Sequence, residues 1–266
     1  MINSEQIKEY ISLGNTSGFY GYGTWSSNIY LIGIEEAGGY SESLIQQKID
    51  KYYELDFGDE GLFDNRTFQY ELTDLSDPKL TNYRDFFDGN LKKGGYIPKI
   101  ATLLKILENS DLDKYEYVGR KLGSNTSNHS LIEILPLPCP KISNWKYASW
   151  VDILRLTYMR TKNSYRKEII AKRVAFIKSK IDETNNNKLI IFLANGNDKI
   201  NYWNKISPID INGYTPLLKS ISYHIYNNKM YVLIPFPGSR SSNGIFNSDE
   251  QIQNIATIIR NLFQSI

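Results

Sequence analysis

Four short apolar runs constrain the fold of this chain more than any other feature. They occupy residues 28–34, 130–135, 188–194 and 229–234 of a 266-residue sequence. Each has the length of a buried strand, and segments with helical periodicity lie between them. Parallel strands need long crossover connections, so this alternation predicts an α/β fold: a three-layer α/β/α sandwich with a central four-stranded parallel sheet. We find no repeat or linker that would divide the chain, and therefore expect one domain over residues 1–266.

Apolar spacing predicts helices over residues 4–13, 97–107 and 164–181, and another containing residues 44–52. Ser248 and Gln251 have the spacing of a capping box, which predicts the start of the last helix. Residues 57–96 are rich in aromatic side chains and show no sustained period. We interpret this segment as an insertion into the domain.

Several classes of protein are excluded by what the sequence lacks. Cys139 is the single cysteine, which rules out an internal disulfide framework and a cysteine-ligated iron–sulfur cluster. His129 and His224 have no spaced metal-ligating partner, and no phosphate-binding loop or nucleophile elbow occurs. No apolar run approaches bilayer length. We expect a cytoplasmic protein with no metal, no other cofactor and no membrane partner.

Charge is distributed unevenly along the chain. Residues 1–90 hold 16 acids and six bases, whereas residues 155–180 hold nine bases and one acid. The basic segment, which includes Arg166 and Lys167, has two interpretations. It forms a solvated helix face, or it is the electrostatic footprint of a polyanion such as DNA.

Each apolar run ends in a loop with distinctive chemistry. Glu35 and Glu36 follow the first run, a proline-rich turn follows the second, and Asn195 begins the loop after the third. The fourth is followed by Pro237, Gly238, Ser239 and Arg240. The carboxyl ends of parallel strands share one edge of a sheet, so these loops are expected to converge on one ligand.

Three of these segments resemble the motifs of the uracil-DNA glycosylase superfamily. They are Gly-Ile-Glu-Glu-Ala-Gly at 33–38, Leu-Pro-Leu-Pro-Cys-Pro at 135–140 with Trp145 beyond it, and Phe-Pro-Gly-Ser-Arg at 236–240. The resemblance implies a monofunctional DNA glycosylase, which takes a base out of the stack and hydrolyses its N-glycosidic bond.

The resemblance also implies roles for particular residues. Glu35 would activate water, with Glu36 as the nearest substitute, and a carboxylate there would also stabilise an oxocarbenium-like transition state. Residues 237–240 would enter the duplex as a wedge, with Arg240 on phosphate. The alternative for the two glutamates is a helix N-terminus, where carboxylates meet the helix dipole.

The sequence departs from the family pattern at three places. Phe236 stands where many members have histidine, and Glu36 or Ala37 stands where they have proline. Glu133 occupies the place of an asparagine that reads uracil. A carboxylate accepts a hydrogen bond from the amino group of cytosine, so Glu133 favours a cytosine-type or otherwise modified base. The length of the aromatic segment 57–96, together with the change at Glu133, suggests room for a bulky modification such as a hypermodified base of phage DNA, and hence a role in phage defence. The alternative for Glu133 is a buried glutamate paired with arginine or lysine.

Other residues are weaker candidates for the base pocket. Tyr40, Phe19 and Tyr22 are candidates for stacking on the extruded base, although aromatic side chains more often belong to a core. Asn128 and Asn195 are candidate polar contacts, and their alternative role is turn formation.

Two other functions remain open at this point. An enzyme of free nucleosides or nucleotides, either a hydrolase or a deoxyribosyl transferase, would use the same acids without needing the basic segment. A catalytically inactive DNA-binding module on the same fold would explain the phenylalanine at position 236. The leading expectation is a monomeric enzyme that acts on duplex or single-stranded DNA.

Overall fold

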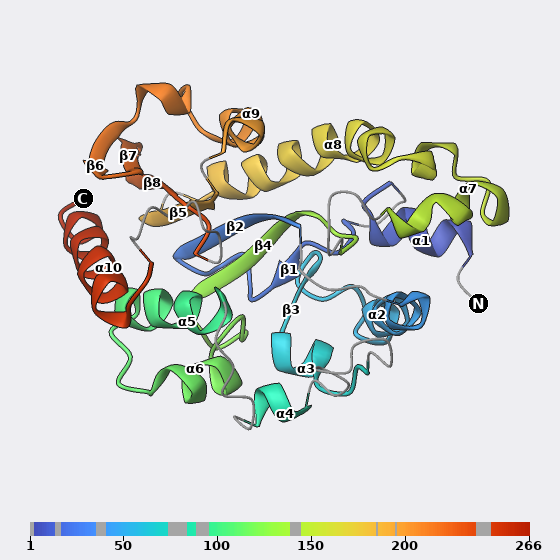
Figure 1. The fold of residues 1–266 in the computed structure, drawn as a ribbon, viewed down its shortest axis with the longest axis horizontal. Coiled ribbons are helices and arrows are strands. Elements are labelled where there is room, and N and C mark those ends of the chain that lie inside the picture. Colours follow the sequence, from blue (N-terminus) through green and yellow to red (C-terminus); the bar gives the residue numbers. More distant parts are fainter. Residues whose placement is uncertain are drawn as a thin grey trace.

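The computed structural model describes residues 3–13, 17–35, 41–73, 84–88, 96–138, 145–184, 186–194, 196–237 and 246–266. In this part of the chain, eight strands form one mixed sheet with the order β3-β1-β4-β2-β5-β8-β7-β6 (Figure 1). The strands are β1 (Gly21–Tyr22), β2 (Ile29–Glu35), β3 (Leu62–Phe63), β4 (His129–Leu135), β5 (Lys188–Leu193), β6 (Thr215–Leu218), β7 (Ile221–Tyr226) and β8 (Lys229–Ile234).

The four strands predicted from the apolar runs are confirmed as β2, β4, β5 and β8. They are mutually parallel in the order β4-β2-β5-β8, with Ile29 of β2 paired to His129 on one side and to Leu189 on the other. The chain moves outward from β2 in one direction to β4 and in the other to β5 and β8. The carboxyl ends of β2 and β5 therefore form a topological switch point, where ligands bind in open α/β sheets.

The prediction of a sheet with four strands is wrong, because the sheet extends on both sides. β1 runs antiparallel to β4 and carries β3 beside it, while β7 runs antiparallel to β8 and carries the edge strand β6. β1 and β3 are two residues long and depend on partners distant in sequence, so no local pattern announces them. Most of β7 is half-buried or exposed, and it lacks the continuous apolar run of a central strand.

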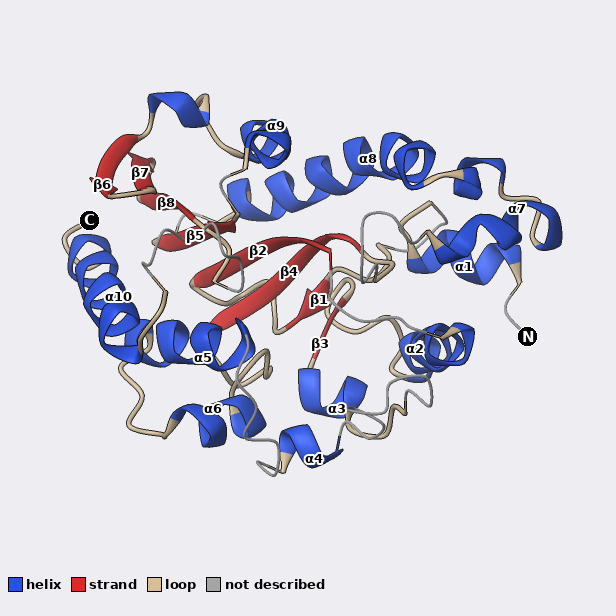
Figure 2. Ribbon diagram, in the orientation of Figure 1, coloured by secondary structure: helices blue, strands red, loops and turns tan. Residues whose placement is uncertain are grey.

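The helices lie on both sides of the parallel strands (Figure 2). They are α1 (Ser4–Tyr10), α2 (Glu42–Glu54), α3 (Asn65–Gln69), α4 (Arg84–Phe87), α5 (Tyr96–Leu107), α6 (Lys114–Arg120), α7 (Trp150–Ile153), α8 (Lys162–Asp182), α9 (Asn197–Ile206) and α10 (Asp249–Phe263), with 3₁₀ turns at Lys146–Ser149, Thr157–Arg160 and Ile211–Gly213. Among the described residues, every helix is too short or too polar to cross a lipid bilayer.

Alternate residues of the parallel strands feed two hydrophobic clusters. On β2, Tyr30, Ile32 and Ile34 belong to the cluster covered by α1, α2, α8 and α9, while Ile29 and Leu31 belong to the one covered by α5, α6 and α10. This alternation follows from the two-residue period of a strand. Both faces of the central strands are therefore buried.

Local signals set the ends of several helices as expected. Ser248 accepts a hydrogen bond from the main chain of Gln251, whose side chain bonds back to the cap, so the predicted capping box is confirmed. The segment interpreted as an insertion is partly core: Leu62, Phe63 and Phe68 are almost fully buried and join the first hydrophobic cluster.

A buried arginine ties α8 to the sheet. Arg173 is fully buried, its guanidinium lies 3.9 Å from the centre of the Tyr20 ring, and it donates four hydrogen bonds. The acceptors are the hydroxyl of Ser12 and the main-chain carbonyls of Phe19, Glu133 and Ile134. One side chain thus fixes β4, α8 and the segment that leads into β1.

Two lysines lie side by side at the amino edge of the parallel strands. Lys188 and Lys229 are paired in register as the first residues of β5 and β8, and both are buried. The ammonium of Lys188 donates to the carbonyls of Trp25 and Ser27 and lies 4.4 Å from the centre of the Tyr30 ring. Burial and, to a smaller extent, the charge of Lys229 lower the pKa of Lys188 from 10.5 to about 8.

The lowered pKa of Lys188 makes stability depend on alkaline pH. Between about pH 8 and 10.5 the unfolded chain holds this proton and the folded chain does not, so the contribution of Lys188 to the free energy of unfolding rises with pH over this window. Urea unfolding of wild type and Lys188→Met at pH 7.5, 8.5 and 9.5 measures the difference. Parallel pH profiles for the two proteins would contradict the lowered pKa.

Candidate functional site

The candidate site is the carboxyl edge of β2, β4, β5 and β8. Glu35 is the last residue of β2, and its backbone pairs with Leu135 at the end of β4. On the other side of β2, β5 ends at Leu193, and α9 begins a few residues later at Asn197. The first predicted glutamate therefore stands beside the switch point between β2 and β5.

Ala194, directly after β5, has a strained backbone. Its φ is +89°, in the left-handed region that residues with a Cβ rarely adopt. Two hydrogen bonds hold it there: its N–H donates to the carbonyl of Ile234 at 2.9 Å, and its carbonyl accepts from the indole of Trp203 at 2.8 Å. Strain that the surroundings enforce is concentrated at functional sites in proteins, and here it coincides with the switch point.

The carboxylate of Glu133 lies over Gly33 on the neighbouring strand. The two residues are paired in register, and a Cβ added to Gly33 would come within 2.7 Å of Oε2 of Glu133. A larger residue at position 33 would therefore displace the carboxylate. The glycine of the first predicted motif creates the space that the predicted base reader occupies.

The backbone of Glu133 is held firmly. Its N–H donates to the carbonyl of Tyr20 at 2.8 Å, and its own carbonyl accepts from Arg173 at 2.8 Å. Burial lowers the pKa of Arg173, and Tyr20 and other neighbours that include the Glu133 carboxylate act in the opposite direction. The alternative role of Glu133, a partly buried acid near an arginine, is therefore supported by these contacts, beside the functional role.

The segment after β8 lies against the start of α5. The rings of Phe236 and Tyr96 have centroids 5.2 Å apart, and Nζ of Lys99 donates to the carbonyl of Pro237 at 3.0 Å. Neither Lys99 nor Tyr96 was predicted from the sequence. A signal was present for Lys99, because a lysine in the first turn of a helix opposes the helix dipole and needs another reason to be there.

The turn after β4 connects the sheet to the start of α8. The N–H of Leu137 donates to the hydroxyl of Tyr165 at 3.3 Å, and the hydroxyl of Tyr147 donates to the carbonyl of Pro138 at 2.7 Å. Arg166, which is half-buried, and Lys167, which is exposed, follow Tyr165 on α8. These two predicted DNA-binding residues are therefore near the carboxyl edge.

The rest of the basic segment is not a continuous cationic surface. Arg173 is fully buried, and Lys162 is buried as well. Lys178 pairs with Asp182 at 3.3 Å, and Lys180 pairs with Glu60 at 2.8 Å and with Glu183 at 3.2 Å. Helical periodicity places the basic residues on different sides of α8, so their number overstates the exposed charge.

Three predicted pocket residues are not brought to this edge. Asn128 precedes β4, about 20 Å from its carboxyl end, and its side chain accepts from the N–H of Asn28 at 3.1 Å. Phe19 and Tyr22 are buried in the core with ring centroids 5.5 Å apart, so they are not available to stack on a base. The predictions for Glu36, Tyr40, Asn195, Gly238, Ser239 and Arg240 lie outside the described residues.

A buried hydrogen-bond network at the amino end of β4 ties this strand to its neighbours. His129 accepts from the N–H of Gly123 at Nε2, 2.9 Å away, so Nδ1 carries the proton and donates to Glu108 at 2.8 Å. Both ring nitrogens are therefore engaged, and the imidazole has no free position to act as a base. Within the described ranges, no group of three or more potential ligands is placed to hold a metal ion.

The comparisons with known proteins add no relative to this picture. Searches against protein-family models, curated proteins and solved structures find no match for the chain.

Proposed function

We propose that the protein is a monofunctional DNA glycosylase that hydrolyses the N-glycosidic bond of a flipped-out modified or mispaired base, such as a cytosine-type or hypermodified phage base. In this proposal Glu35 activates water, Glu133 reads the base, and residues 237–240 contact the duplex. The enzyme acts as a monomer on DNA in the cytoplasm. Helices on both faces of the parallel strands support a three-layer α/β/α sandwich as its frame.

The observation that carries the proposal is that the Glu133 carboxylate lies over Gly33 near the carboxyl ends of β4 and β2, next to the strand end formed by Glu35. A carboxylate lies over a glycine, and two residues further along the same strand a second acid ends β2. Hydrolysis of an N-glycosidic bond uses one carboxylate to activate water or to stabilise the positive charge of the transition state. Recognition of a base with an amino group uses another carboxylate as a hydrogen-bond acceptor. The chain supplies both within one short stretch of sheet.

An excision assay tests the proposal. Duplexes of one sequence carrying cytosine, 5-hydroxymethylcytosine, a glucosylated cytosine or uracil, together with natural phage DNA, are incubated with the full chain. Abasic sites are then revealed by alkaline cleavage. We expect abasic sites with wild type, and Glu35→Gln purified in parallel controls for a contaminating enzyme. Absence of abasic sites on every DNA would contradict the proposal.

Glu133 is expected to set the preference between bases. In Glu133→Gln the acceptor is partly lost, and we expect excision of a cytosine-type base to slow by about 5- to 100-fold, the range that one good base contact provides. Excision of uracil, which presents a carbonyl at that position, should not slow. The measurement is the single-turnover rate on matched duplexes, and equal rates of wild type and Glu133→Gln on cytosine-type DNA would refute the role of Glu133 as reader.

Gly33→Ala is the matched control that keeps the charge of Glu133 but moves its carboxylate. The added methyl group meets the flexible end of Glu133, so the carboxylate must shift while its charge is retained. If the position of the Glu133 carboxylate matters, we expect Gly33→Ala to slow excision of a cytosine-type base as well. A rate equal to wild type would mean that the carboxylate is not used at the place where it lies.

A second candidate function is supported by the state of the basic segment. Several of its cations are buried or paired with acids, which weakens the argument that this segment binds a large polyanion such as DNA. The same two glutamates would serve an N-glycosidase or deoxyribosyl transferase that acts on free nucleosides or nucleotides. Salt distinguishes the two functions. Glycosylase activity on DNA falls steeply between 50 and 200 mM salt, roughly as counterion release predicts, whereas turnover of a free nucleoside does not.

A further inference from the structure

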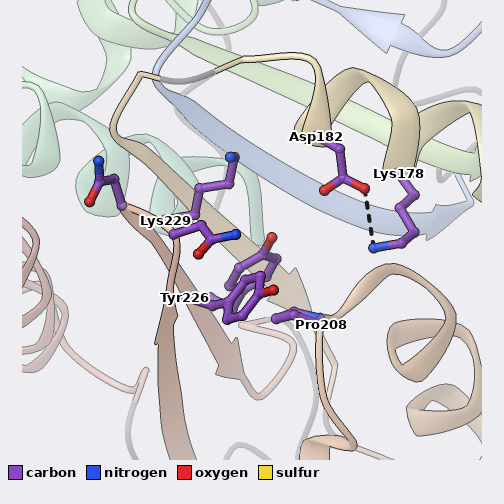
Figure 3. Close-up of a pocket in the computed structure, with 8 residues that line it drawn as sticks. Lys178, Asp182, Pro208, Tyr226 and Lys229 are labelled. Atoms are coloured by element: carbon purple, nitrogen blue, oxygen red, sulfur yellow. Dashed lines mark ion pairs between the residues drawn. The ribbon is translucent and has the colours of Figure 1, made fainter.

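A polar cavity of about 710 Å³ opens at the amino edge of the sheet (Figure 3). Its walls come from the C-terminal end of α8, from the turn between β7 and β8, and from the first residues of β8. Lys229 begins β8, whereas Pro237 follows the end of that strand, so the cavity and the candidate site lie at opposite edges. Cavities of this size hold small organic ligands.

Lys229 supplies an uncompensated positive charge to the cavity. It lines the cavity and is 6% exposed, yet its ammonium has no hydrogen-bond or ion-pair partner among the residues that the structure describes. Its partner in register on β5 is another cation, Lys188, whose pKa the charge of Lys229 helps to lower. The stem of Lys229 is buried while its ammonium faces the cavity, so an anion bound there would place an attractive charge beside two neighbouring cations.

The other charges of the cavity wall compensate each other. Lys178 and Asp182, one turn apart on α8, form an ion pair at 3.3 Å (Figure 3). Burial and then the charge of Asp182 raise the pKa of Tyr231 above its usual range, so its hydroxyl stays protonated and remains a donor. The lining as a whole is therefore cationic and rich in donors, which favours an anionic ligand.

A flat ring surface lies at the rim beside this charge. The side chain of Tyr226 lines the cavity and is about half exposed, with its ring stacked at 6.5 Å on that of His224. Asn227 and Asn228 follow, both with positive φ, in the tight turn that joins β7 to β8. Their amides offer donors and acceptors next to an aromatic face, which is the combination that recognises a planar heterocycle.

We propose that this cavity binds a nucleoside monophosphate, with the phosphate at Lys229 and the base against Tyr226. The inference is independent of the proposed function, because it uses no residue of the carboxyl edge.

Calorimetric titration of the full chain at low ionic strength tests this site with deoxyadenosine monophosphate, deoxyadenosine and inorganic phosphate as separate ligands. The monophosphate is expected to bind more tightly than either the nucleoside or phosphate alone. Lys229→Met should weaken its binding at least tenfold. Tyr226→Ala should weaken binding of the monophosphate but leave binding of phosphate unchanged. Lys205→Met, which removes an exposed lysine on α9, is the matched control and should bind like wild type.

Lys229→Met removes a repulsion with Lys188, so its melting temperature should equal or exceed that of wild type. Asp182→Asn, at an exposed carboxylate of the wall, gives an independent readout and should tighten binding severalfold. Three results would overturn the proposal: no heat with the monophosphate, equal affinity of wild type and Lys229→Met, or inorganic phosphate binding as tightly as the nucleotide.

Discussion

Glu35→Gln is expected to slow base excision by roughly 100- to 10,000-fold, the range that a positioned general base contributes. Glutamine keeps the size of the side chain but does not take up a proton from water. The position supports this assignment, because Glu35 ends the central strand β2 opposite Leu135 and beside the switch point with β5. Single-turnover rates on the DNA that wild type cleaves, quantified after alkaline treatment, give the ratio.

Glu36→Gln tests the alternative assignment, since it makes the same change one residue later. Glu36 lies outside the described residues. Comparing the two variants shows whether Glu35 or Glu36 activates water. If Glu35→Gln retains the wild-type rate while Glu36→Gln loses it, the general base is Glu36. If neither variant slows excision, water activation by a carboxylate of this loop is refuted.

Arg173→Met is expected to lower the free energy of unfolding by at least about 4 kcal/mol. It would leave four buried acceptors without their donor, and each unsatisfied group costs about 1–3 kcal/mol. The aliphatic part of methionine fills only some of the space and makes none of the hydrogen bonds to the segment before β1 or to β4. Urea unfolding, with the m-value checked for two-state behaviour, measures the loss.

Lys172→Met is the matched control for Arg173→Met. It removes one positive charge from the adjacent, exposed position of α8, so its stability should stay within about 0.5 kcal/mol of wild type. Arg173→Lys tests geometry, because one ammonium does not reproduce the planar fork of a guanidinium and should recover only part of the loss. Wild-type stability of Arg173→Met would show that the network contributes little.

Local sequence patterns predicted the features that depend on nearby residues. The continuous apolar runs identified β2, β4, β5 and β8 because strands buried on both faces carry few polar residues. The cap at Ser248 and the apolar stripe of α5 were likewise predictable, since capping and helical periodicity act over a few residues. The place of Glu35 at a strand end followed directly from the first run.

Features that depend on pairing between distant segments were not predictable. The contact of Glu133 with Gly33 requires the register of β2 against β4, which no local pattern specifies. Arg173 looked like one more cation of a basic helix, and its burial follows from carbonyl acceptors supplied by segments far away in the chain. The positive φ of Ala194 arises from its bonds to Ile234 and Trp203, which also come from other elements.

The order of the central strands has a consequence for folding. β2 is made early in the chain, yet its neighbour β5 lies beyond residue 187, and the register that joins Ile29 to Leu189 closes a very long loop. During synthesis β2 cannot pair with β5 until most of the protein has left the ribosome. Long-range parallel pairing is slow and leaves unpaired strand edges exposed, so this chain should fold more slowly than a helical protein of its size and should gain from chaperone protection.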